Sequence, residues 1–216
     1  MLASCLFPNN KGWTLLETLV VMGMAGIFLL ALYGFYRFNL RVLNAETTRL
    51  HVRESSRLAT EFLVRELRMA GARPVQTDGT DECDGFERLL IAEEQAIAFQ
   101  YDFRGDRSGM PPEGCPDDPS EYVMYLYDDQ SQMLRRATGR GSAQPFIGDV
   151  PRDGFLLFYF DREGTELLPP LDAAERTAVF LIDLVIRAAR RHPDPQVGKL
   201  ITAELRSAIF LANPPN

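Results

Sequence analysis

A long uncharged segment close to the amino terminus constrains the fold of this chain more than any other feature. Residues 19–36 carry no charged side chain, and as a helix these 18 residues would be about 27 Å long, close to the thickness of the hydrocarbon core of a bilayer. One carboxylate, Glu17, lies at the front of the apolar stretch, where a charge is costly unless it has a partner. The sequence therefore predicts a membrane-spanning helix with a functional acidic residue at its start.

The residues before this helix are arranged in an unusual order. They read MLASCLFPNNKG, a short polar-ended leader that finishes at Gly12. A secretory signal peptide places its apolar stretch before the small residue at which it is cut. Here the small residue comes first, so cleavage after Gly12 would leave the apolar helix on the mature chain. Residues 1–12 are therefore expected to be a leader peptide.

The combined segment KGWTLLETLVVMGMAGIFLLALYG resembles the start of type IV prepilins and type II secretion pseudopilins. That family shares a leader ending in Lys-Gly or Arg-Gly, an aromatic residue, Thr-Leu-x-Glu and about twenty apolar residues. The resemblance implies that a prepilin peptidase cuts between Gly12 and Trp13 and methylates the new amino terminus of Trp13. It also implies a single-pass inner-membrane protein with a periplasmic domain that later joins a pilus or pseudopilus. One departure is Trp13, where the family usually has Phe.

Glu17 acquires a physical role from this resemblance. The carboxylate can pair with the positively charged amino terminus of Trp13, in the same or an adjacent subunit, and the pairing offsets the cost of desolvation. An alternative is a plain signal anchor with Glu17 at the level of the lipid headgroups. The charges that flank the helix do not decide the orientation, because Arg37 and Arg41 follow it while Lys11 precedes it.

The helical pattern continues well beyond the uncharged segment. After Tyr36 no helix-breaking residue occurs until Gly71, which is followed by Pro74. This predicts one helix of about 55 residues from about Thr14, with a transmembrane and assembly half over residues 13–38 and an amphipathic half over residues 39–71. The apolar stripe expected to pack on a sheet comprises Leu43, Leu50, Leu58, Phe62 and Met69, with Ala59 and Leu63 beside them. Glycines 23, 26 and 34 are expected to let neighbouring helices approach or let the helix bend.

The residues at the end of the long helix indicate which branch of this family the chain resembles most. The run FLVRELRMAGARP is similar to the corresponding segment of PilW-type minor pilins and their GspJ-type pseudopilin relatives. The later segments AFQYDFRGDRSG, YVMYLYDD and MLRRA resemble a strand theme of PilW-like proteins. A charged helix end with a glycine cap would account for the first run equally well on local grounds.

Residues 72–216 contain a series of strand patterns and are expected to form a globular β-rich domain. Apolar and polar residues alternate at positions 122–127 and 155–159, as in half-buried strands. Residues 178–189 could be helical by period, but their Val and Ile content favours a strand. The fold class is therefore α+β, a long amino-terminal helix packed on an antiparallel sheet, as in pilins. The strands are expected at FERLLIA, AIAFQYDF, EYVMYLYDD, QMLRRAT, FLLFYFD, AVFLIDLVIRAA and ITAELRSAIFLA.

Two cysteines, Cys83 and Cys115, lie in polar loops on either side of the strand expected at Ala96. They would be the only pair in the mature chain, because Cys5 leaves with the leader. In an oxidising periplasm they are expected to form a disulfide worth about 3 kcal/mol. The alternative is two free thiols.

The composition argues against several other functions. A formal net charge of −7 makes a nucleic-acid partner unexpected. The acidic loops around Asp81 and Asp117 lack the spacing of a calcium loop and are interpreted as solvated. Neither His51 nor His192 has a nucleophile or metal ligand at a recognisable spacing. We therefore expect no enzyme activity, no cofactor and no metal.

The leading interpretation is a minor pilin of a type IV pilus that acts in filament assembly or initiation near the tip. Its partners would be other pilins or pseudopilins, the prepilin peptidase and, before assembly, inner-membrane lipid. Three alternatives remain open: a minor pseudopilin of a type II secretion system, a binding or adhesion module displayed on a filament, and an enzyme with an uncleaved anchor. The last of these predicts Met1 or Leu2 at the amino terminus in cells.

Overall fold

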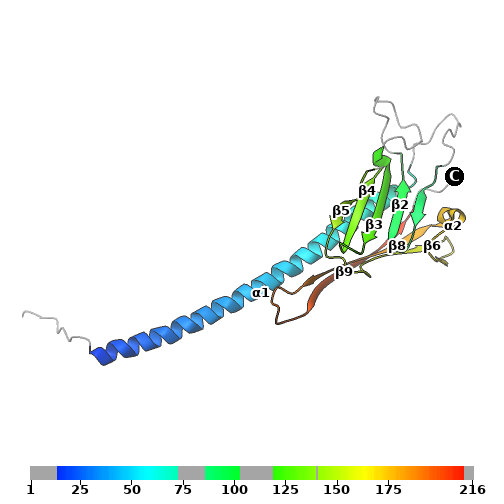
Figure 1. Cartoon of the computed structure of the whole chain (residues 1–216). Coiled ribbons are helices and arrows are strands. Elements are labelled where there is room, and N and C mark those ends of the chain that lie inside the picture. The colour runs from blue at the N-terminus through cyan, green and yellow to red at the C-terminus, as the bar shows by residue number, and fades with distance from the viewer. Residues whose placement is uncertain (1–13, 73–85, 103–118, 140, 212–216) are drawn as a thin grey trace, which may run out of the picture. The chain divides into compact units, whose positions relative to one another are not determined.

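The computed structural model describes residues 14–72, 86–102, 119–139 and 141–211. A long helix is followed by two antiparallel sheets, which confirms the α+β class (Figure 1). The chain divides into two compact units, Met1–Glu46 and Thr47–Asn216. The first contains the apolar part of the helix, and the second contains the rest of the helix and both sheets.

Helix α1 spans Leu15–Met69, 55 residues, in agreement with the helix predicted from the sequence. Gly71, two residues after the helix, terminates it with a φ of +75°, in the left-handed region that favours glycine. The backbone N–H of Gly71 donates to the carbonyl of Gln100 at 2.9 Å, so the helix end is tied to the first sheet. A Cβ at position 71 would lie 2.8 Å from Cγ of the buried Arg88, so the close approach also requires glycine.

The prediction that the apolar stripe of α1 packs on the sheet is wrong for most of the residues in that stripe. Leu43, Leu50, Leu58 and Phe62 are all exposed. The face that packs on the sheets lies on the opposite side of the helix and includes Ala59 and Leu63, which the pattern had placed beside the stripe. Its buried members are Val52, Ser56, Ala59, Thr60, Leu63, Glu66, Leu67 and Ala70.

The physical reason for this difference is the size of the residues on the packed face. Small side chains such as Ala59 and Ala70 let the helix axis approach the sheets closely. The hydroxyls of Ser56 and Thr60 are buried without penalty because each donates to a carbonyl one turn back, at 2.9 Å and 2.8 Å. A pattern based on leucines therefore identified the wrong face.

The first sheet is an antiparallel meander of five strands in the order β1-β2-β3-β4-β5. Four of its strands lie where the sequence predicts them, and β5, an edge strand containing Pro145, was missed. The strands are β1 Leu89–Ala92, β2 Ala96–Gln100, β3 Tyr122–Asp128, β4 Met133–Thr138 and β5 Gln144–Ile147. The 3-10 turn η1, Pro119–Glu121, precedes β3.

The second sheet has four strands in the order β7-β6-β8-β9, so the strands form two sheets rather than the single sheet expected. Alternation shows which face of a strand is buried, but it does not specify which strands pair. The strands are β6 Phe155–Phe160, β7 Glu166–Leu167, β8 Leu181–Arg191 and β9 Leu200–Phe210. Residues 181–191 are a strand, as predicted, whereas β7 and the short helix α2, Ala173–Ala178, were not anticipated.

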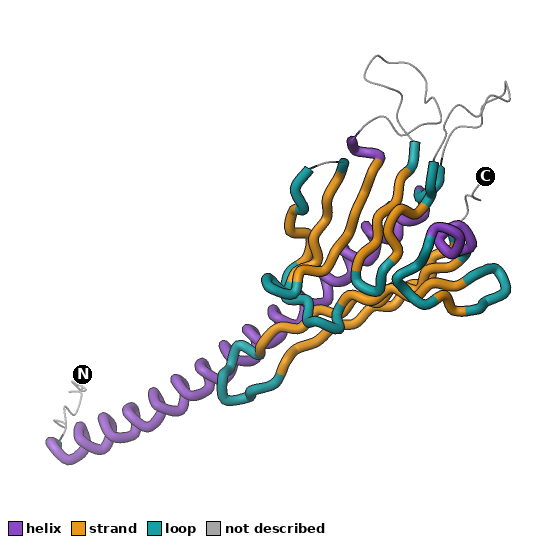
Figure 2. The backbone as a smooth tube through the Cα atoms, turned by 45° about the vertical axis from the view of Figure 1, so that its right-hand side comes forward, coloured by secondary structure: helices purple, strands orange, loops and turns teal. Residues whose placement is uncertain are grey.

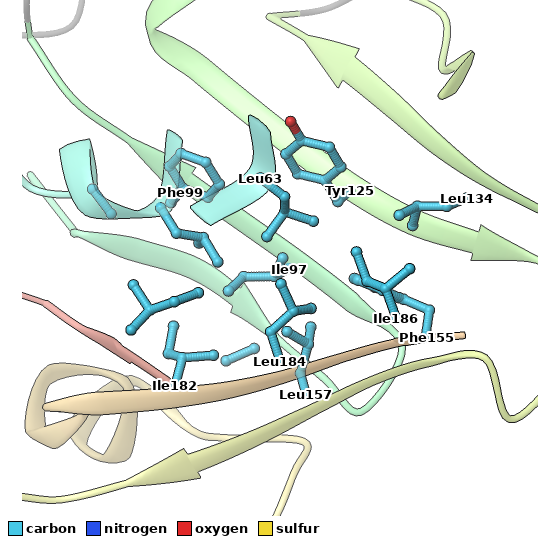
Figure 3. Close-up of a cluster of buried hydrophobic side chains, with 14 of the residues drawn as sticks. Leu63, Ile97, Phe99, Tyr125, Leu134, Phe155, Leu157, Ile182, Leu184 and Ile186 are labelled. Atoms are coloured by element: carbon cyan, nitrogen blue, oxygen red, sulfur yellow. The ribbon is translucent and has the colours of Figure 1, made fainter. Parts of the chain in front are cut away.

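The core of the second unit lies between α1 and the inner faces of the two sheets. Figure 3 shows Leu63 of α1 directed toward Ile97 and Phe99 of β2 and Tyr125 of β3, with Leu157 of β6 and strand β8 on the other side. Every second residue of β6 is buried, which confirms the alternation predicted at positions 155–159. This core fixes the part of α1 that follows Thr47.

Candidate functional site

The apolar part of α1 is the most unusual surface of the molecule. All of residues 14–38 are exposed, including a run of large leucine, methionine, phenylalanine and valine side chains. By length and composition this segment is able to cross a membrane. A helix that is apolar on all sides requires lipid or other protein around it, since water would have to solvate the whole surface. The candidate site is therefore this helix and its first turn.

The first turn is closed by a reciprocal pair of hydrogen bonds. The backbone N–H of Glu17 donates to Oγ1 of Thr14 at 3.3 Å, and the backbone N–H of Thr14 donates to Oε2 of Glu17 at 3.4 Å. This is a capping box, in which the residue before the helix and the third residue inside it satisfy each other's free N–H groups. The carboxylate also lies at the positive end of the helix dipole. Glu17 is thus held at the amino-terminal end of the helix.

Sequence reasoning missed this cap, although the signal was present. The four residues Thr14-Leu-Leu-Glu17 have the Thr-x-x-Glu spacing that marks a capping box before an apolar run. The role predicted for Glu17, pairing with a cleaved amino terminus, involves Gly12 and Trp13, which lie outside the described residues. That role remains a prediction, and the cap adds a local function to the same side chain.

Glycines 23, 26 and 34 lie on this exposed helix with open space around them. A Cβ built at any of the three would meet no described atom within 4 Å. Glycine is therefore not required at these positions by packing within the chain. Their predicted role in close helix–helix approach is a property of contacts with other molecules and stays a prediction.

Further along α1, Glu66 forms a buried polar junction with the first sheet. Its carboxylate accepts hydrogen bonds from Arg136 at 2.6 Å and 3.0 Å, and from the hydroxyl of Tyr125. The Arg136 guanidinium also stacks on the rings of Phe62 and Tyr125, 5.6 Å and 6.0 Å from their centroids. Only 6% of Glu66 is exposed, so this carboxylate is a fixed attachment point between helix and sheet.

The electrostatics of this junction follow from its burial. Burial raises the pKa of the Tyr125 hydroxyl well above its ordinary value, and the hydrogen bond to Glu66 raises it further. For Arg136, burial lowers the pKa, but the hydrogen bonds to Glu66 more than offset this and leave it raised. Tyr125 therefore stays protonated and Arg136 stays charged, which keeps the junction intact across the physiological pH range.

The other residues singled out by the sequence are dispersed. Cys83, Cys115 and the acidic loops around Asp81 and Asp117 lie outside the described residues. His51 is exposed on α1, and Nδ1 of His192 accepts from the backbone N–H of Asp194 in the β8–β9 turn, at 3.0 Å. Within the described ranges, no group of three or more His, Cys, Asp or Glu side chains could hold a metal ion.

Comparison with known proteins found similarity in structure but none in sequence. No family model matches the sequence, and no curated protein matches it. Among solved structures, the chain is similar to a type IV-like pilin from Thermus thermophilus, with 14% sequence identity and a TM-score of 0.49. The similarity covers 76% of this chain and 96% of that one.

Proposed function

We propose that this chain is a minor pilin of a type IV pilus, cut by a prepilin peptidase between Gly12 and Trp13 and methylated on Trp13. It is anchored in the inner membrane by one helix, holds its globular domain in the periplasm, and acts in filament assembly or initiation near the tip. One observation carries the proposal: an apolar helix exposed on every side begins with a fixed carboxylate, five residues after the glycine of a prepilin-type leader.

The exposed helix supplies the driving force for assembly. Before assembly, lipid covers its apolar surface. In a filament, the equivalent helices of neighbouring subunits cover it instead, and glycines 23, 26 and 34 allow those helices to approach closely. The globular domain remains outside this bundle and presents its surface to sibling subunits.

The pairing of Glu17 with an amino terminus favours one arrangement of neighbouring subunits over others. The capping hydrogen bond holds its carboxylate next to the backbone N–H of Thr14, which is joined directly to Trp13. Cleavage after Gly12 converts Trp13 into the amino terminus and places a positive charge at this end of the helix. Pairing between that charge and Glu17, within a subunit or between two, offsets the cost of placing the carboxylate in an apolar environment.

Two further elements belong to the proposal. Cys83 and Cys115 form a disulfide in the oxidising periplasm. A minor pseudopilin of a type II secretion system would use the same helix and the same carboxylate, so the two machines are separated by their partners. Co-purification from membrane extracts, followed by identification of the bound subunits, distinguishes them.

Substitutions at Glu17 test the proposal because cap and charge can be separated. Glu17→Gln keeps a side chain that closes a capping box but removes the charge, whereas Thr14→Ala removes half of the cap and keeps the charge. Glu61→Gln, at an exposed position of the same helix, is the matched control. The measurement is the fraction of each processed variant found in sheared filaments rather than in membranes.

We expect Glu17→Gln and Glu17→Ala to be processed normally and to enter filaments at least about tenfold less than the wild type, which is the effect of losing roughly 1.4 kcal/mol of pairing. Thr14→Ala and Glu61→Gln should enter at close to the wild-type level. Normal incorporation of Glu17→Gln would contradict the role of the charge. A defect in Thr14→Ala beside normal incorporation of Glu17→Gln would show that the cap, and not the charge, is what incorporation requires.

A further inference from the structure

The β8–β9 hairpin extends beyond the rest of its sheet. The two strands pair from Leu181↔Phe210 to Arg191↔Leu200, but β6 accompanies β8 only as far as Ile186. The loop between β5 and β6 adds two more backbone hydrogen bonds to β8, from Arg187 to the carbonyl of Gly154 and from Ala189 to the carbonyl of Asp149, both at 2.7 Å. Beyond that point the hairpin is a two-stranded ribbon, which ends in the turn over residues 192–199 (Figures 1 and 2).

The turn is an ordered structure rather than a loose connection. The backbone N–H of His192 donates to the carbonyl of Lys199 at 3.0 Å, and that of Val197 donates to the carbonyl of Asp194 at 3.1 Å. Gly198, with φ of +60°, allows the chain to reverse. The turn and the strand ends enclose an open cavity of about 470 Å³. Side chains at the tip are therefore displayed from a defined backbone.

The chemistry of the tip contrasts with that of the whole chain. Arg191 and Lys199 are exposed there in a protein with a net charge of −7, whereas the neighbouring Arg190 pairs with Asp149 at 3.6 Å. Asp194 is the one carboxylate in residues 190–200, so the two cations outnumber it. In the part of the chain that the structure describes, neither Arg191 nor Lys199 takes part in an ion pair. Two apolar side chains stand beside these cations, Val197 at 43% and Leu200 at 60% exposure. Cationic heads next to exposed apolar groups match a surface of anionic headgroups over hydrocarbon.

A short stretch of chain connects the globular unit to the apolar segment. Within the globular unit, both views place the β8–β9 turn at the opposite end of β8 from α2 (Figures 1 and 2). Along the chain, Thr47 follows Tyr36, the last residue of the uncharged segment, by 11 residues, or about 16 Å of helical rise. The chain itself therefore tethers the globular unit to the proposed membrane segment over a short distance.

We propose that the tip of the β8–β9 hairpin contacts the anionic phospholipid headgroups of the membrane in which the chain is anchored. Arg191 and Lys199 bind headgroup phosphates, and Val197 and Leu200 reach the boundary with the acyl chains. This contact rests on the proposed membrane anchoring, and it holds the globular unit against the bilayer before assembly. Extraction into a filament then requires the contact to be released.

The test uses the full chain reconstituted in lipid nanodiscs, either of phosphatidylcholine alone or with phosphatidylglycerol added. Hydrogen–deuterium exchange of peptides that cover residues 191–200 reports contact at the tip. The variant Arg191→Gln/Lys199→Gln removes two positive charges. Arg162→Glu, an equal change of charge after the far end of β6, is the matched control, because Phe160 pairs with Leu181 at the opposite end of β8 from Arg191.

We expect the tip to exchange more slowly in discs that contain phosphatidylglycerol, with wild type and Arg162→Glu behaving alike. Each basic side chain near an anionic surface contributes roughly a fivefold preference, so the double variant should reduce tip occupancy about thirtyfold. Raising the salt to about 1 M, where the screening length is about 3 Å, should remove the protection.

Three results would overturn the contact. Equal exchange in both kinds of disc would show that the headgroup charge is not recognised. Protection by inorganic phosphate in phosphatidylcholine discs would identify a free anion as the ligand. Failure of the chain to enter discs at all would remove the anchor and the contact together, whereas a chain that enters discs with an unprotected tip would leave the anchor standing.

Discussion

The junction around Glu66 allows a quantitative test of how the helix is attached to the sheet. Glu66→Gln keeps the shape of the side chain but presents an amide N–H₂ to Arg136, so donors face each other and a buried cation loses its counter-charge. Removing one partner of a buried ion pair typically costs 3–5 kcal/mol. Because 26% of the Arg136 side chain is exposed, water compensates in part, and we expect a loss of about 2–3 kcal/mol in the free energy of unfolding.

A second variant separates the loss of a partner from the value of the network itself. In Glu66→Leu/Tyr125→Phe/Arg136→Met the polar atoms that form the junction are replaced together, so none of them is left unpaired. Such replacements are often close to neutral, and we expect stability within about 1 kcal/mol of the wild type.

The assay is urea unfolding of the full chain in mild detergent, followed by near-ultraviolet circular dichroism of the buried aromatic side chains. A constant dependence on urea would show that the same surface is exposed in each variant. Glu61→Gln, which breaks an exposed pair with Arg57, is the control and should leave the free energy of unfolding almost unchanged. A Glu66→Gln cost no larger than this control, or a triple variant less stable than Glu66→Gln, would refute the reasoning.

Three further substitutions examine the fold by the same assay. Leu63→Ala, at a fully buried position of α1, should lower the free energy of unfolding by about 2–5 kcal/mol, whereas Leu58→Ala, on the exposed face, should lower it by less than about 1 kcal/mol. Similar losses in the two variants would show that Leu58 belongs to the packed face, as the sequence pattern predicted. Gly71→Ala should lower the free energy of unfolding clearly more than Gly164→Ala, because both glycines have positive φ but, of the two, position 71 lacks room for a Cβ. Equal losses would show that the backbone conformation accounts for the effect and the contact with Arg88 does not. The pKa of Asp128 is lowered by hydrogen bonds from a serine hydroxyl and an arginine of the β3–β4 hairpin, so its charged form contributes stability above about pH 4 and loses it as the pH falls through the lowered value. Asp128→Asn should therefore be less stable than the wild type at pH 6, with the difference vanishing in acid; a difference that persists would contradict the assignment.

The sequence predicted those features of the fold that depend on local signals. The helix from Leu15 to Met69 could be predicted because its end at Gly71 and the absence of earlier breakers are visible in the residues themselves. Strand β8 could be predicted because its β-branched content outweighs its helical period. In each case the evidence lies within a few residues of the element.

Features that depend on depth or on distant partners could not be predicted in the same way. The buried face of α1 was misassigned because the spacing of the larger apolar residues was taken as its marker, whereas the packed side combines Leu63 and Leu67 with alanine, serine and threonine. Glu66 looks like an ordinary surface glutamate in the sequence, and only the fold brings Arg136, 70 residues later, onto its carboxylate. The division of the strands between two sheets likewise reflects pairing that alternation alone does not encode.

The proposed function depends on the exposed helix and its acidic first turn becoming the amino-terminal end of the mature chain. This processing can be tested without any substitution. The amino-terminal peptide of the chain, isolated from membranes of cells that contain a prepilin peptidase, should begin at Trp13 and carry one added methyl group by mass spectrometry. An amino terminus at Met1 or Leu2 in the same preparation would contradict the account, because the helix would then be an uncleaved anchor and Glu17 would have no free amine to meet.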